Sequence, residues 1–176
     1  MFRAALLFAL TLAAYAGLPP GRPLADAPIS LVNGKKLDLK QYRGKALVLV
    51  LISTTCAHCG EVVDLMTQIQ KDEGPHGLQI VVAAGDDNGA LAVIPFSNAH
   101  KPNFPLGYVD RPTLRKLASL TLKDRPFVPI LIFVDAKGAV RVQIFGNDPL
   151  LEKPEGIIRN TIRELLKEPG MTAAKK

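Results

Sequence analysis

Two kinds of hydrophobic pattern alternate along the chain and predict strands and helices in turn. Unbroken apolar runs at residues 45–52, 78–84 and 128–134 are typical of strands buried on both faces of a sheet. Apolar residues at helical spacing, with polar residues between them, predict amphipathic helices at 59–71 and 154–167. Strands that alternate with helices in this way indicate an α/β fold.

Shorter elements complete this pattern. Asn33 and Gly34 form a turn signal between apolar residues and predict a hairpin over 29–39. Pro95 is expected to end or kink the helix in which it lies. The remaining predicted elements are a helix, a strand, a helix and a final strand, at 90–98, 104–109, 112–120 and 139–145. Together they predict a three-layer fold with a mixed central sheet and helices on both faces.

The N-terminus carries a segment that does not belong to this domain. Arg3 precedes an apolar run that ends in Ala14-Tyr15-Ala16, the small-x-small pattern that signal peptidase cuts. The run of about 15 residues is shorter than the ~20 that span a bilayer. We therefore expect residues 1–16 to be a cleaved secretory signal, with an uncleaved membrane anchor or an ordinary buried helix as alternatives. Export would place the domain in an oxidising compartment such as the periplasm.

The rest of the chain divides into three parts. Residues 17–27 are rich in Pro, Gly and Ala and predict a linker, 28–168 form the domain, and 169–176 form a C-terminal tail. The 176 residues are 48% hydrophobic and 22% charged, which suits one globular domain. The net charge of +6 is scattered and Trp is absent, so no nucleic-acid partner is expected.

The only two cysteines, Cys56 and Cys59, stand where a buried strand is predicted to meet a helix. A helix N-terminus presents unpaired N–H groups and a positive dipole end, and both stabilise a thiolate. We expect Cys56 to be the accessible thiol and Cys59 the deeper one. His58, between them, can donate a hydrogen bond to the thiolate and stabilise the reduced form. This arrangement predicts thiol–disulfide exchange at the two cysteines.

Other chemistry for the cysteine pair is less consistent with the sequence. Zinc needs four ligands, and Cys56 and Cys59 would need at least a histidine beside them. Covalent haem needs C-x-x-C-H, and Gly60 stands at the position of that histidine. His76 and His100 lie in turn-like stretches and are expected at the surface. No cofactor is predicted, and a purely structural disulfide would close a loop too small to stabilise the fold much.

Residues 28–168 resemble the extracytoplasmic thioredoxin-like proteins of the TlpA/ResA type. The resemblance is carried by two stretches, LVNGKKLDLKQYRGKALVLVLISTTCAHC and VPILIFVDAKGAV. It implies that Pro129 is a cis-proline opposite the cysteines, leaving the Val128 backbone exposed for pairing with a substrate peptide. An ordinary trans proline that begins a strand is the alternative.

The resemblance also implies a function and partners. Its members are thiol–disulfide oxidoreductases outside the cytoplasm, with protein thiols and disulfides as substrates. An electron donor, either membrane-bound or soluble, would restore the active form. The N-terminus would serve as a membrane tether if it is not cleaved.

Three positions depart from the family pattern and leave alternatives open. Thr55 replaces a Trp, Val50 a buried acid of thioredoxins, and Val62 a Glu of the TlpA/ResA type. Glu61 and Asp64 are nearby acids that would act through water, although a solvated helix face explains them as well. A non-catalytic binding module with a structural disulfide is therefore the alternative function.

A thiol peroxidase is a further alternative. Such enzymes need Thr and Pro at set distances before the reactive cysteine. Here Ser53 stands three residues before Cys56, and no Pro lies in the preceding predicted strand. The sequence therefore favours exchange with protein disulfides over the reduction of peroxide.

Overall fold

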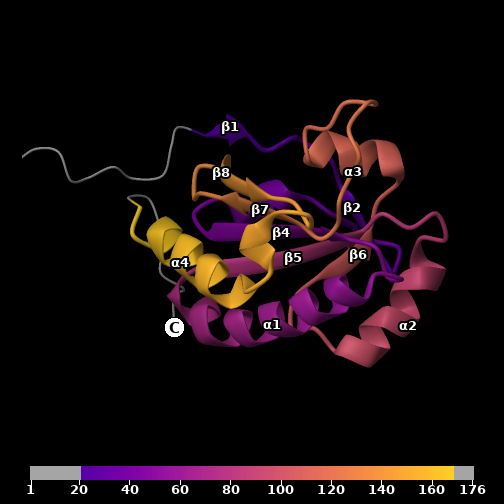
Figure 1. Ribbon diagram of the computed structural model, residues 1–176, viewed down its shortest axis with the longest axis horizontal. Coiled ribbons are helices and arrows are strands. Elements are labelled where there is room, and N and C mark those ends of the chain that lie inside the picture. The colour runs from indigo at the N-terminus through magenta and orange to yellow at the C-terminus, as the bar shows by residue number, and fades with distance from the viewer. Residues whose placement is uncertain (1–20, 169–176) are drawn as a thin grey trace, which may run out of the picture.

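An eight-stranded mixed sheet in the order β1-β8-β7-β4-β5-β6-β2-β3 forms the centre of the protein (Figure 1). The computed structural model describes residues 21–168, so the predicted signal segment and C-terminal tail lie outside the described residues. In chain order the strands are β1 (Arg22–Pro23), β2 (Ile29–Leu31), β3 (Lys36–Leu37), β4 (Ala46–Ile52), β5 (Leu78–Ala84), β6 (Leu106–Tyr108), β7 (Ile130–Val134) and β8 (Ala139–Ile144).

Helices cover both faces of this sheet, as the sequence predicts. The α-helices are α1 (Ala57–Glu73), α2 (Ala90–His100), α3 (Arg111–Leu117) and α4 (Pro154–Leu166), and short 3₁₀ turns are η1 (Leu39–Tyr42), η2 (Gly74–His76) and η3 (Pro149–Leu151). Figure 1 shows α1 and α4 on one face and α3 on the other. Within residues 21–168, no helix is both long and apolar enough to cross a membrane.

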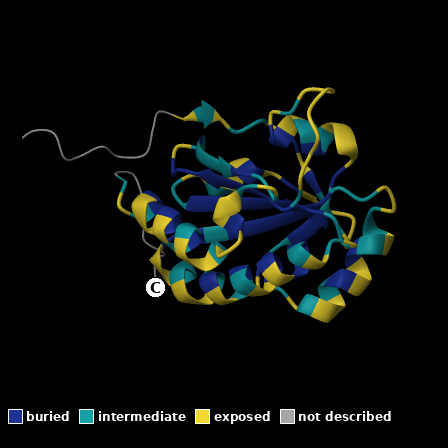
Figure 2. Ribbon diagram, in the orientation of Figure 1, coloured by how far each residue is buried: buried dark blue, intermediate teal, exposed yellow. Residues whose placement is uncertain are grey.

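The two faces of β4 divide the hydrophobic core into two clusters. Val48 and Val50 face the cluster that includes side chains of α1, α2 and α4. Leu47, Leu49 and Leu51 face the second cluster, on the side of α3. Figure 2 shows the central strands buried and the outer turns of the helices exposed. Every residue of β4 is buried because the strand has a helical layer on each side.

Several elements differ from the sequence prediction. α2 continues through Pro95 to His100, although proline cannot donate the hydrogen bond that a helix interior normally makes. Part of the predicted linker lies on the domain: β1 pairs with β8 as an edge strand, and Ala27 is only 7% exposed. A two-residue strand is too short to produce a periodic pattern. The hairpin is confirmed, with Gly34 at φ +80° in its turn.

Candidate active site

The register of the sheet brings three chain segments to one edge. β4 and β5 are parallel, and Ile52 pairs with Ala84 at their shared end. β7 runs antiparallel to β4, and Leu51 pairs with Ile130, the first residue of β7. The residues that follow β4, those that follow β5 and those that precede β7 therefore meet at this edge. Ligand sites in α/β proteins commonly lie at such an edge.

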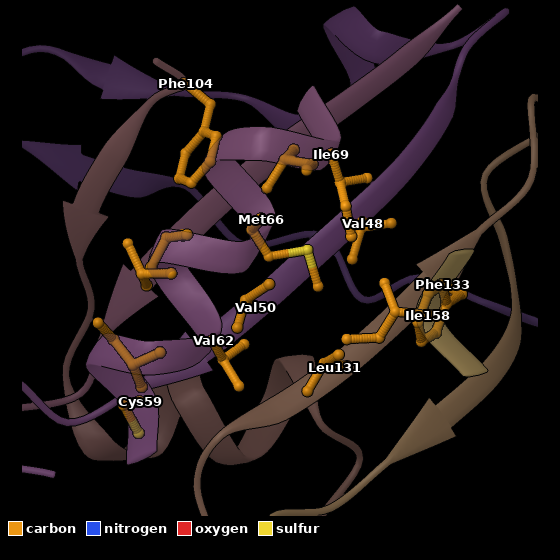
Figure 3. Close-up of a cluster of buried hydrophobic side chains, with 14 of the residues drawn as sticks. Val48, Val50, Cys59, Val62, Met66, Ile69, Phe104, Leu131, Phe133 and Ile158 are labelled. Carbon is orange, nitrogen blue, oxygen red and sulfur yellow. The ribbon is translucent and has the colours of Figure 1, made fainter. Parts of the chain in front are cut away.

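The two cysteines occupy the junction of β4 and α1. Cys56 is the N-cap of α1 and is partly buried, and its carbonyl accepts the Cys59 N–H at 3.0 Å. Cys59 lies in the first helical turn, is 0% exposed, and stands at one end of the cluster in Figure 3. The neighbours of Cys59 in this cluster include Val62 of α1. The predicted placement, one accessible thiol and one deeper thiol, is confirmed.

The Cys59 thiol is strongly disposed to keep its proton. The two cysteines are free thiols, hydrogen-bonded to each other. Burial raises the pKa of Cys59 far above the ordinary value, and the hydrogen bond with Cys56 adds to this. The negative charge of Asp86 also raises the Cys59 pKa, while a hydrogen bond from the Ser53 backbone opposes the shift.

This raised pKa predicts that the dithiol form loses stability at alkaline pH. Above about pH 9 the unfolded Cys59 thiol loses its proton, whereas the folded protein keeps it. The unfolded state then binds fewer protons, so the free energy of unfolding falls as pH rises, by up to about 1.4 kcal/mol per pH unit. Urea unfolding of reduced wild type and of Cys59→Ala, at about pH 8 and about pH 10, measures this slope. Equal pH slopes in the two proteins would contradict the prediction.

The peptide bond between Val128 and Pro129 is cis, as the family resemblance predicts. Val128 is partly buried and packs against both hydrophobic clusters. Gly146, which follows β8, lies directly against this segment, because the Gly146 N–H donates to the Phe127 carbonyl at 2.8 Å. A Cβ at position 146 would stand 2.3 Å from the Val128 oxygen. Only glycine fits this position without displacing the Val128–Pro129 segment, which precedes β7 at the sheet edge where β4 ends.

The structure pairs each histidine near α1 with a carboxylate. His58 Nδ1 lies 3.1 Å from Glu61 Oε2, and the two side chains are 39% and 76% exposed. His100 differs from the surface position expected for it. Its Nδ1 lies 2.8 Å from Asp64 Oδ1, and its ring contacts Phe96 with 4.4 Å between the ring centroids.

His100 also explains why residue 60 is glycine. A Cβ at Gly60 would lie 2.7 Å from the His100 ring, so α1 and α2 approach each other closely here.

As for metal binding, no group of three His, Cys, Asp or Glu side chains that could hold a metal ion occurs in the part of the chain that the structure describes.

Comparison with known proteins identifies relatives of this fold and site. No family model matches the chain. The thiol–disulfide oxidoreductases ResA of Bacillus thuringiensis (strain Al Hakam) and Bacillus anthracis are each 26% identical to it over 139 residues. These alignments cover 79% of this chain and 76% of each relative.

Solved structures share the fold. A thioredoxin family thiol:disulfide interchange protein of Chlorobium tepidum TLS aligns with a TM-score of 0.69 at 19% identity, covering 84% of this chain and 98% of its own. A secreted disulfide oxidoreductase of Mycobacterium tuberculosis aligns with a TM-score of 0.60 at 16% identity, covering 77% and 96%. The chain therefore has the thioredoxin fold and is similar in sequence to thiol–disulfide oxidoreductases of the ResA type.

The site of this chain lacks the acids expected from the family resemblance. Val50 and Val62, which replace the acids expected from the family, are buried in the hydrophobic cluster next to Cys59. Glu61 and Asp64 are paired with histidines. Neither Glu61 nor Asp64 is among the groups that shift the Cys59 pKa.

Asp86 is the acid that the sequence reasoning missed. It follows β5, and its carboxylate accepts hydrogen bonds from the Ser53 hydroxyl at 2.8 Å and the Thr54 N–H at 2.9 Å. The sequence feature that could have pointed to Asp86 was its position just after the apolar run of a buried strand. Because β5 is parallel to β4, residues just after both strands reach the same edge.

Proposed function

We propose that the protein is a thiol–disulfide oxidoreductase that acts on protein disulfides outside the cytoplasm through Cys56 and Cys59. The observation that carries the proposal is the thiol pair at the start of α1, with a partly exposed Cys56 and a fully buried Cys59. The similarity to the ResA proteins supports the same chemistry. The predicted signal segment supports a place beyond the inner membrane.

The reaction proceeds in two exchange steps. The Cys56 thiolate attacks one sulfur of the substrate disulfide, the new S–S bond forms, and the other substrate sulfur leaves with the electron pair and takes a proton from water. Cys59 then attacks the Cys56 sulfur and releases the second substrate thiol. The substrate is reduced and the protein holds a Cys56–Cys59 disulfide. A thiol donor, membrane-bound or soluble, then reduces that disulfide, and the same steps in reverse oxidise a substrate.

Two neighbours of the cysteines have supporting roles in this proposal. The Val128 backbone, next to Pro129, pairs with an extended substrate segment and places its disulfide against Cys56. His58 stabilises the Cys56 thiolate by its positive charge when protonated. The positive end of the α1 helix dipole stabilises the Cys56 thiolate in the same way.

Reduction of insulin with dithiothreitol as electron donor tests the function. We expect the protein to reduce insulin several times faster than dithiothreitol does alone. Absence of turnover would favour the non-catalytic binding module, and rapid consumption of peroxide would favour the thiol peroxidase. The reduction potential of the cysteine pair then gives the direction: about −270 mV indicates a reductant and about −120 mV an oxidant.

A further inference from the structure

The second exchange step needs a proton acceptor. The Cys59 thiol is buried and keeps its proton, yet only the thiolate attacks the mixed disulfide. The positions where related proteins carry an acid are filled here by Val50 and Val62, which pack in the core. The proton of Cys59 must therefore leave by another route. The inference below rests on the proposed function and names a residue for its second step.

Ser53 connects the two cysteines to Asp86. The Ser53 carbonyl accepts the Cys56 N–H at 3.2 Å, and its backbone also hydrogen-bonds the Cys59 sulfur. The Ser53 hydroxyl donates to Asp86 Oδ1 at 2.8 Å, and the Thr54 N–H holds Oδ2 at 2.9 Å. The carboxylate is thus fixed at both oxygens against the turn that carries the cysteines.

Asp86 also has access to solvent. It lines an open groove of about 580 Å³ beside β6 and the start of α3. The cations of this groove bond to other groups: Arg111 to Asp87 at 2.8 Å and Lys36 to the Ser30 hydroxyl at 2.5 Å. Five charged or titratable groups line the groove with Asp86, and Cys59 of α1 senses its charge; the five are Lys36, Asp87, Tyr108, Asp110 and Arg111.

We propose that Asp86, by way of a water molecule, accepts the proton of Cys59 when Cys59 resolves the mixed disulfide. The water takes the Cys59 proton while it passes one of its own protons to the Asp86 carboxylate, which the Ser53 hydroxyl and the Thr54 N–H hold in place. The Cys59–Cys56 bond forms, the bond from Cys56 to the substrate sulfur breaks, and that sulfur leaves with the electron pair as a thiolate. Asp86 then releases its proton to water in the groove.

The two exchange steps can be measured separately with 5,5′-dithiobis(2-nitrobenzoate). Attack by Cys56 releases one coloured thiolate, and resolution by Cys59 releases a second. In Asp86→Asn we expect the second phase to slow at least about tenfold at about pH 7 while the first phase is unchanged. The variant's second phase should then accelerate about tenfold per pH unit, because hydroxide replaces the lost acceptor. Ser53→Ala should slow the second phase as well, by a smaller factor, since it removes one of the two hydrogen bonds that hold the Asp86 carboxylate in place.

Asp87→Asn is the matched control, because it also removes one negative charge and lies next to Asp86 in the sequence. The Asp87 side chain is exposed and pairs with Arg111. It should leave both phases as in wild type. If Asp86 acted only through its charge, Asp86→Asn would lower the Cys59 pKa and speed the second phase. An equal or faster second phase in Asp86→Asn overturns the inference. A wild type without a first phase would instead overturn the proposed function.

Discussion

Replacing Cys56 by serine should abolish disulfide exchange, whereas replacing Cys59 by serine should stop the reaction halfway. Cys56 is the partly exposed thiol at the N-cap of α1, so its loss removes the nucleophile that meets the substrate. We expect insulin reduction by Cys56→Ser to fall at least about a thousandfold. In Cys59→Ser the first bond still forms, but no second thiol is present to release the substrate.

Trapped mixed disulfides distinguish the two variants. Tagged Cys59→Ser, produced in an oxidising compartment, should carry client proteins that dithiothreitol releases on a gel, and Cys56→Ser should carry none. Equal thermal unfolding midpoints for the two variants would show that the difference in trapping does not come from a loss of folding. Trapping by Cys56→Ser instead would mean that Cys59 is the attacking thiol and that the assignment is wrong.

Gly146→Ala should damage both stability and activity. The new Cβ would stand 2.3 Å from the Val128 oxygen and 2.5 Å from its carbonyl carbon, and these are backbone atoms that cannot rotate away. Moving them costs about 1–3 kcal/mol of unfolding free energy, as overpacking usually does. The displaced segment precedes β7 at the sheet edge where the cysteines follow β4, so insulin reduction should fall beyond the loss explained by unfolding.

Gly156→Ala is the control for this change. Gly156 lies in α4, and apart from its chain neighbours and the backbone of its own helix no heavy atom lies within 4 Å of the position its Cβ would take. Alanine is favoured over glycine inside a helix by about 0.5–1 kcal/mol, so this variant should be slightly more stable than wild type and equally active. Urea unfolding and insulin reduction report both quantities. A Gly146→Ala protein as stable and active as Gly156→Ala would contradict the packing argument.

The buried strands and the cysteine junction were predictable from the sequence. The run at 78–84 coincides with β5, and the run at 45–52 contains β4, because strands covered on both faces are apolar at every position. Cys59 opens the predicted helical pattern, which was enough to place it in the first turn of α1, with Cys56 between that helix and the preceding strand. An unbroken apolar run in the sequence indicates a strand that is buried on both faces, and β4 and β5 are such strands.

Contacts between distant segments were not predictable in the same way. Asp86 reaches Ser53 only because β4 and β5 align at Ile52 and Ala84, and a single sequence does not give that register. His100 packs on Gly60 because α1 and α2 lie close together, whereas its local sequence is typical of an exposed turn. Such pairings depend on tertiary structure, which a local pattern does not encode.

The outermost strands of the sheet, β1 and β3, have only two residues each. A long bare strand at a sheet border is a template on which extended polypeptides polymerise into fibres, and short border strands suppress this. Under the proposed function, extended segments of substrate proteins approach this sheet during exchange. The short outer strands disfavour aggregation with such segments, and the proposal leaves pairing with a substrate to the Val128 backbone.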